Sequence, residues 1–150
     1  MHRRSARSPV GPVVVTVLVI LMVGALSIPG RSDAQVTGGG TDVTVKARLT
    51  GWIARRDGFH LYRERATVRL AVGVWPALRG ERVRARLEWR RAGRRWQLLD
   101  VSSTRLNLDS RGLFLVRGLP AGYAFRIRAR VRAGDGHGAA RSQWGYFRVL

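Results

Sequence analysis

The residues of this sequence with the clearest capacity for chemistry are arginines that recur at every second position in two separate stretches. They are Arg82, Arg84 and Arg86 in the first stretch and Arg126, Arg128, Arg130 and Arg132 in the second. A guanidinium group is planar, stays charged, and presents its N–H donors as a fork that matches a carboxylate, phosphate or sulfate group. The two series therefore predict contact with a polymer that carries repeated anionic groups.

Composition offers a second explanation of the arginines. The 150 residues include 28 basic and 9 acidic side chains, a formal net charge of +19, and Lys46 is the single lysine. Abundant Arg, Ala, Gly and Val with almost no Lys are typical of a GC-rich coding sequence. Two origins therefore stay open: coding bias, with long arginine stems covering apolar surface at exposed positions, or selection for an anionic partner.

The sequence contains no recognisable catalytic, metal or cofactor signature. His60 and His137 are the only histidines after the first two residues, and neither has a second ligand at helical or strand spacing. The acidic residues are scattered, which disfavours two carboxylates acting together in a cleft. Asp135-Gly136 is typical of a turn, because no further acids follow that could bind calcium. We therefore expect no enzyme, no metal and no cofactor.

The elements that must position the arginines are β-strands, because apolar and polar residues alternate along most of the chain after residue 42. Turn sequences such as Arg56-Asp57-Gly58 and Ala92-Gly93 separate the alternating runs. Seven or eight short strands in about 110 residues predict an all-β fold, a two-sheet antiparallel sandwich spanning residues 42–150. The predicted strands are 43–49, 66–74, 82–90, 95–101, 104–108, 113–117, 123–132 and 144–149.

The stretch Leu119-Pro120-Ala121-Gly122-Tyr123 and the alternating residues after it resemble the strand F signature of fibronectin type III domains. This resemblance implies that Tyr123 is a tyrosine corner, with its hydroxyl bonded to the backbone of the preceding connection. The chain is similar as well to bacterial immunoglobulin-like modules, in which a tryptophan hairpin precedes an Asp-Xaa-Xaa-Gly turn. The corresponding residues here are Trp96 and Asp109-Ser110-Arg111-Gly112. Both families remain candidates.

The resemblance to fibronectin type III domains implies that strands 82–90 and 123–132 are neighbours and that both arginine series share one outer face. Like charges opposite one another destabilise a sheet, and stacking of guanidinium planes on aromatic rings relieves this. The stretch Arg141-Ser142-Gln143-Trp144-Gly145 is similar to part of the Trp-Ser-Xaa-Trp-Ser motif of cytokine-receptor modules, where such stacks form. The candidates for stacking are Trp144, Tyr146 and Trp75. The residues expected to have structural roles are Tyr123, Trp89, Trp96 and Trp144.

Residues 1–34 have the layout of a signal peptide. Basic residues precede an apolar run from Val13 to Ile28, and Ser32-Asp33-Ala34 offers small residues where a signal peptidase cuts. Residues 35–41 are a Gly-rich linker. The apolar run is also just long enough to remain as a membrane anchor. Both alternatives place the bulk of the chain outside the cytoplasm.

Taken together, these features predict a secreted or extracytoplasmic, non-enzymatic binding or structural module whose basic sheet face contacts an anionic polymer of the cell envelope. The alternative is a protein–protein interaction module of the fibronectin type III kind, which contacts another envelope protein through an edge strand or loops. A nucleic-acid partner fits the charge but not the export signal. A membrane is a partner only if the N-terminal segment is retained.

Overall fold

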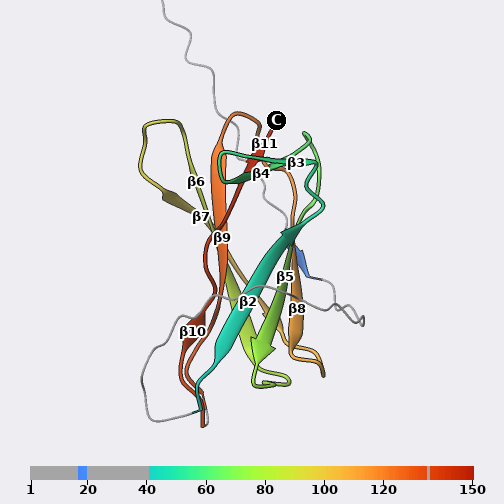
Figure 1. Ribbon diagram of the computed structural model, residues 1–150, viewed down its shortest axis with the longest axis vertical. Coiled ribbons are helices and arrows are strands. Elements are labelled where there is room, and N and C mark those ends of the chain that lie inside the picture. Colours follow the sequence, from blue (N-terminus) through green and yellow to red (C-terminus); the bar gives the residue numbers. More distant parts are fainter. Residues whose placement is uncertain (1–16, 20–40, 135) are drawn as a thin grey trace, which may run out of the picture.

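The computed structural model describes residues 17–19, 41–134 and 136–150. Its strands are β1 (Val17–Val19), β2 (Thr44–Thr50), β3 (Ala54–Arg56), β4 (Phe59–Tyr62), β5 (Val68–Trp75), β6 (Arg82–Arg90), β7 (Gln97–Arg105), β8 (Arg111–Val116), β9 (Ala124–Val131), β10 (Ala140–Arg141) and β11 (Gly145–Val149). They form two sheets (Figure 1). One has the order β1-β8-β5-β2 and the larger has the order β3-β4-β11-β9-β6-β7, with β10 beside β9.

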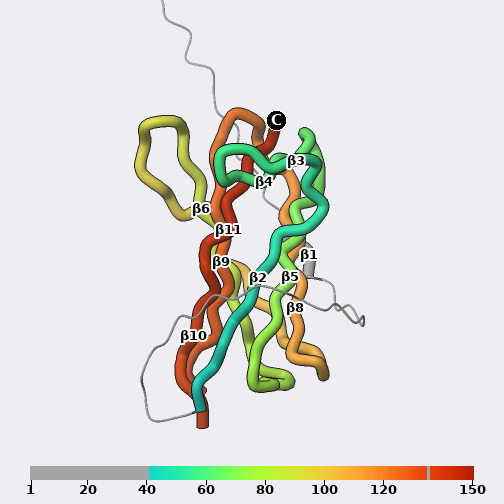
Figure 2. The backbone as a smooth tube through the Cα atoms, viewed as in Figure 1, coloured from blue at the N-terminus to red at the C-terminus, as the bar shows by residue number. Residues whose placement is uncertain are grey.

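The predicted all-β, mainly antiparallel fold is confirmed. The pairing of β4 with β11 is parallel, and the other pairs between named strands are antiparallel. The described residues include no helix that is long and apolar enough to cross a membrane. Between Thr50 and Ala54 the chain passes from the smaller sheet to the larger one (Figure 2).

The strand predictions differ from the structure in two places. The predicted strand 95–101 and the first two residues of the predicted strand 104–108 belong to one continuous strand, β7 (Gln97–Arg105), at an edge of the larger sheet. The short strands β1, β3 and β10 were not predicted, and β4 forms where the sequence is compatible with a short strand or a loop. All three residues of β3 are exposed, so this strand has no apolar alternation that could reveal it.

The core fills the space between the two sheets with the inward side chains of both. The largest fully buried side chains are Tyr62, Phe114, Phe125 and Phe147. The ring of Phe147 stacks on Phe125 with centroids 5.2 Å apart and meets Tyr62 edge-on at 5.7 Å. All members of the buried apolar cluster lie between Val43 and Val149, so the core belongs to the predicted domain.

The predicted turn at Arg56-Asp57-Gly58 is confirmed and joins β3 to β4. Asp57 and Gly58 have φ values of 51° and 79°. Two consecutive left-handed residues are the backbone of a tight hairpin turn, which Asp-Gly adopts at low cost. This hairpin places β4 beside β11 and brings Tyr62 into the core.

Most of the predicted signal segment lies outside the described residues, as does the predicted linker apart from Thr41. Within that segment, Val17–Val19 form β1 and pair with Phe114–Val116 of β8 at the edge of the smaller sheet. Cleavage and anchoring both stay predictions.

The structure gives Tyr123 a different role from the expected tyrosine corner. Its hydroxyl accepts hydrogen bonds from Nε and Nη2 of Arg91 at 3.2 and 3.0 Å, and its ring lies 4.8 Å from that of Trp89. The buried Tyr62 instead donates to the backbone carbonyl of Thr50 at 3.0 Å. Arg91 follows the end of β6, and its guanidinium lies over the Tyr123 ring, with Cζ 5.4 Å from the ring centroid.

We expect Tyr62→Phe to lower the free energy of unfolding by about 1 kcal/mol, because the Thr50 carbonyl loses the hydrogen bond from the Tyr62 hydroxyl while the ring packing stays. Burial raises the pKa of Tyr62, so the hydroxyl remains a donor across the neutral range. Urea unfolding followed by circular dichroism measures the change. Tyr123→Phe is the matched control, and its exposed bond predicts a smaller loss. Equal losses would contradict the role given to Tyr62.

Candidate anion-binding face

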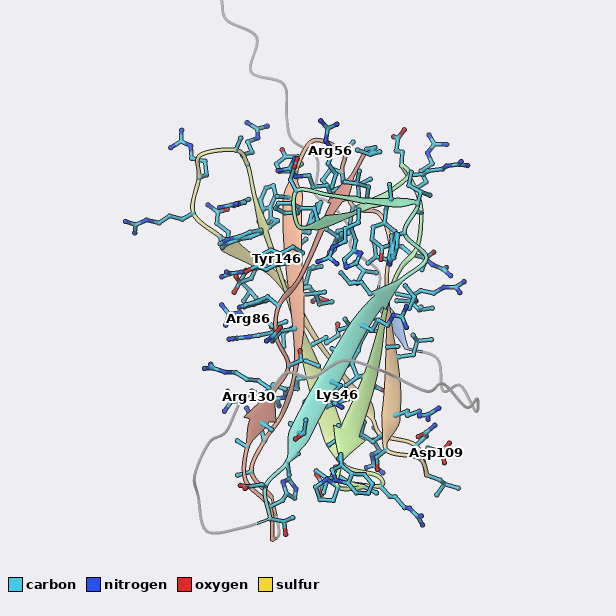
Figure 3. All side chains as sticks on the ribbon, viewed as in Figure 1. Lys46, Arg56, Arg86, Asp109, Arg130 and Tyr146 are labelled. Carbon is cyan, nitrogen blue, oxygen red and sulfur yellow. The ribbon has the colours of Figure 1, made fainter. Side chains whose placement is uncertain are left out.

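The outer face of the larger sheet brings the two arginine series together. Strands β6 and β9 are neighbours, and their outward residues pair as Arg84 with Arg130, Arg86 with Arg128 and Glu88 with Arg126. Arg82 lies opposite Arg105 of β7. Arg132 follows the end of β9 at Val131 and lies outside these rows. Figure 3 shows Tyr146, Arg86 and Arg130 following one another along one side of this sheet.

Glu88 is the buried carboxylate that joins the two series. Its Oε1 accepts from Nε of Arg86 at 2.6 Å, and its Oε2 accepts from Nε of Arg126 at 2.7 Å. A register shift between Leu87 and Glu88 lies at this point of the β6–β7 pairing. Burial raises the pKa of Glu88, but the hydrogen bonds and charges of Arg126 and Arg86 outweigh it and hold the pKa below its ordinary value.

Two tryptophans separate the guanidinium groups of this face. Trp96 lies between Arg90 and Arg126, whose Cζ atoms are 4.4 and 4.7 Å from its ring centroid. Trp144 lies between Arg126 and Arg128, at 4.2 and 4.3 Å. The resulting alternation Arg90–Trp96–Arg126–Trp144–Arg128 is called here the tryptophan–arginine stack. Each cation faces the negative face of an indole ring, which offsets the repulsion between neighbouring arginines.

Arg128 is the most crowded cation described for the tryptophan–arginine stack, as its lowered pKa indicates. Burial lowers the pKa of Arg128, and the positive charges of Arg141 and Arg86 lower it further. Its guanidinium remains cationic, since the ordinary value of an arginine is far above neutrality. The lowered pKa therefore identifies a crowded cation, whose charge is offset in part by the carboxylate of Glu88 and which lies against the ring of Trp144.

Trp144 and Trp96 each follow a local feature of the chain, a pair of hydrogen bonds to Ser142 and the β6–β7 hairpin. The backbone N–H of Ser142 donates to the Ala129 carbonyl at 2.9 Å, and the Ser142 hydroxyl accepts from the Ala129 N–H at 3.0 Å. In the gap between β10 and β11, just before Trp144, this side-chain bond stands in for a backbone ladder bond to β9. Trp96 follows the predicted turn at Ala92-Gly93, which is confirmed as the β6–β7 hairpin.

Some of the predicted aromatic residues stack on arginines of this face and others do not. Trp144 stacks on arginine as predicted, and Trp96 stacks although it was expected only to have a structural role. Tyr146 contacts the Trp96 ring at 6.0 Å rather than an arginine. Trp89 packs against the core. Trp75 is wrong as a stacking partner, because it ends β5 in the other sheet.

Below the stack, the same face carries arginines with no carboxylate among them. Arg130 pairs with Arg84 on one side and with Arg141 of β10 on the other, and Arg82 pairs with Arg105. These five exposed residues are called here the open arginine cluster. Directly opposed residues on neighbouring strands lie about 5 Å apart. Within the described part of the chain, the ion pairs of this face involve Glu88, Arg86 and Arg126, not the cluster.

The two histidines lie away from this face and from each other. His60 of β4 lies 5.2 Å from the Trp52 ring, and its pKa is lowered by burial and then by the charges of Arg55 and Arg48. His137 is buried, with Nδ1 3.0 Å from the Gly138 carbonyl. In residues 17–19, 41–134 and 136–150, no three His, Asp or Glu side chains gather in a way that could hold a metal ion.

Comparison with known proteins adds no assignment: no family model matches the chain, and no curated protein matches it. The functional argument therefore depends on the geometry of the arginine face alone. Sequence reasoning found its arginines but missed Glu88 and Arg90. The signal for Glu88 was present, since it is the single acid within the alternating arginine series.

We expect Glu88→Gln to lower the free energy of unfolding by about 2 kcal/mol at pH 7, because two charge-assisted hydrogen bonds lose their anion. Arg86 is half exposed and regains water, which keeps the loss below that of a fully buried pair. Urea unfolding measures the change. Glu81→Gln, at an exposed site, is the matched control with the same change in charge.

The same pair of proteins tests the pH dependence. Because the folded-state pKa of Glu88 is depressed, its stabilisation is present above the ordinary value of 4.5 and is lost as the pH falls through the lower folded value. The difference in stability between wild type and Glu88→Gln should therefore shrink below about pH 4.5. A difference that stays constant down to acid unfolding would contradict the ionised state assigned to Glu88.

Proposed function

We propose that residues 42–150 are an extracytoplasmic, non-enzymatic module of the fibronectin type III or immunoglobulin-like kind. We further propose that this module contacts an anionic polymer of the cell envelope through the open arginine cluster. The observation that carries this proposal is that arginines from β6, β7, β9 and β10 share one exposed face and that, among the described residues, none of them forms a salt bridge. The two-sheet order with a shared apolar core supports the sandwich module.

The proposed site is narrower than the two arginine series. Arg86 and Arg126 already share the Glu88 carboxylate, and the planes of Arg126 and Arg128 lie against indole rings. These three side chains therefore have fewer donors to offer an outside anion. Arg84 and Arg130 are exposed and face each other across the sheet, so a phosphate or carboxylate placed between them meets two guanidinium groups.

Electrostatic repulsion within the cluster favours the same function. Like charges directly opposite one another across a sheet destabilise it, and Arg84–Arg130, Arg130–Arg141 and Arg82–Arg105 are three such pairs. A bound polyanion removes this repulsion, so its binding free energy adds to the stability of the fold. The interaction lies at the surface and is screened by salt.

One observation favours a second function, contact with another envelope protein. Strand β7 is an edge strand of the larger sheet, and Leu98 and Val101 on it are exposed. An exposed edge strand with apolar side chains is a template for strand addition by a partner chain. Binding through this edge depends little on salt, which separates it from binding by the arginine cluster.

We expect the double variant Arg84→Gln/Arg130→Gln to bind long-chain inorganic polyphosphate about tenfold more weakly at low salt, which corresponds to the loss of two weak charge contacts. Its affinity should also fall less steeply with salt. The matched control is Arg48→Gln/Arg69→Gln, which makes the same change in net charge on the outer face of the smaller sheet. Titration calorimetry over a range of NaCl concentrations measures both.

Equal losses in the two double variants would show that only the overall charge matters and would overturn the proposed site. Binding of envelope proteins that survives about 0.5 M NaCl and is lost on Leu98→Lys would instead favour the edge strand β7 as the functional surface.

A further inference from the structure

One end of the sandwich exposes two large apolar side chains that neither the core nor the arginine face uses. Trp75 and Leu108 are 74% and 76% exposed, the highest values among the large hydrophobic residues that the structure describes. Trp75 ends β5, and Leu108 lies in the turn between β7 and β8. Exposed apolar groups that cluster at one place mark sites of interaction.

These two side chains leave the sheet on neighbouring segments. Gly73 of β5 pairs with Arg111 of β8, and beyond this pair the Val74 N–H donates to the Ser110 carbonyl at 3.0 Å. Strand β5 ends and β8 begins at the end of the sandwich opposite the β3–β4 hairpin (Figure 1), and Asp109, next to Leu108 in the sequence, lies at this end in Figure 3. Trp75 and Leu108 therefore lie on neighbouring segments at one end of the sandwich.

Hydrogen bonds fix the turn that carries Leu108. Oδ1 of Asn107 accepts from the N–H groups of Asp109 and Arg111 at 3.0 and 2.8 Å. Ser110, with φ of 56°, is buried beneath the turn. Because this backbone is held in place, the exposure of Leu108 is built into the turn and does not depend on a disordered tip.

The chain also enters the domain at this end. Thr44 at the start of β2 pairs with Trp75. Whatever precedes the domain is therefore tethered beside the exposed pair, and the sequence predicts an apolar segment from Val13 to Ile28 followed by a short linker. An anchor in that position would hold Trp75 and Leu108 toward the membrane, and its insertion would take β1 away from the edge of β8.

Basic side chains lie on the segments that are tied to the turn carrying Leu108. Arg82 and Arg105 face each other on β6 and β7, and Arg79 is exposed in the preceding loop. Two backbone bonds tie that loop to the β7–β8 connection: Gly80 N–H to the Leu106 carbonyl at 3.0 Å, and Leu106 N–H to the Glu81 carbonyl at 2.8 Å. Glu81 and Asp109 are also exposed here, but the open arginine cluster continues the positive surface away from them.

We propose that this end of the domain docks on an anionic lipid bilayer. Trp75 and Leu108 enter the boundary between head groups and acyl chains, where the indole ring keeps its N–H in contact with polar groups. Arg79, Arg82 and Arg105 contact lipid phosphates, which favours bilayers of negative surface charge. The proposal goes beyond polymer binding, since its apolar contacts come from the end of the sandwich and not from the arginine face.

The test uses tryptophan fluorescence of the full chain on vesicles that contain a shallowly brominated phosphatidylcholine, which quenches only tryptophans near the membrane surface. On vesicles rich in phosphatidylglycerol, we expect clear quenching in the wild type and loss of most of it in Trp75→Phe. Trp52→Phe is the matched control, because Trp52 is 39% exposed but lies beside the β3–β4 hairpin at the other end. Its quenching should equal that of the wild type.

A second variant tests docking without changing the reporter. Leu108→Ser should reduce the quenching of Trp75 several-fold while leaving polyphosphate binding unchanged, whereas Arg84→Gln/Arg130→Gln should do the reverse. Failure of one proposal is thus distinguishable from failure of the other. Unchanged quenching in Trp75→Phe, or equal quenching on neutral vesicles, overturns membrane docking. So does a dimer in sedimentation without lipid that Leu108→Ser converts to a monomer, because the surface would then belong to a second copy.

Discussion

The shared carboxylate of Glu88 is the interaction on which the arginine face depends. Two strands that both present arginines outward repel one another, and this repulsion weakens their pairing unless it is offset. Glu88, which is paired with Arg126 across β6 and β9, offsets part of this repulsion. Its carboxylate accepts hydrogen bonds from Arg86 on its own strand and from Arg126 on β9. Because the carboxylate is buried under these two arginines, it binds them rather than water.

The tryptophan–arginine stack extends this compensation along the sheet. Glu88 supplies a single negative charge, and the guanidinium groups of Arg90 and Arg128 lie against the indole rings of Trp96 and Trp144. Neither contribution reaches Arg84, Arg130 and Arg141, which keep their charge and their exposure. One sheet face is thereby divided into a half that is internally satisfied and a half that is open to an external anion.

The same sandwich separates two kinds of surface. The open arginine cluster lies on strands, where backbone pairing fixes the spacing of its charges. The apolar pair Trp75 and Leu108 lies on the segments at one end, where the chain enters the domain. Arg82 and Arg105 belong to the open arginine cluster and lie close in the chain to the segments tied at Leu106, so the two proposed surfaces share these arginines.

Much of the fold and part of the face could be predicted from local patterns. Alternation gives the strands, since a half-buried strand needs one apolar side, and Asp57-Gly58 gives a turn because of its left-handed backbone. The short exposed strand β3 carries no such pattern, and the role of Tyr123 depended on Arg91, a residue distant in sequence. Both escaped prediction because their structure is set by neighbours rather than by their own residues.

The sequence by itself determined an all-β chain with two series of outward arginines and an unusual positive charge, because strand period and composition are properties of single segments. Only the tertiary structure decided which arginines are satisfied and which are open. That outcome depends on the register of β6 against β9, which sets Glu88 opposite Arg126 and Arg84 opposite Arg130. Register is fixed by contacts between segments far apart in the chain, and a linear pattern does not contain them.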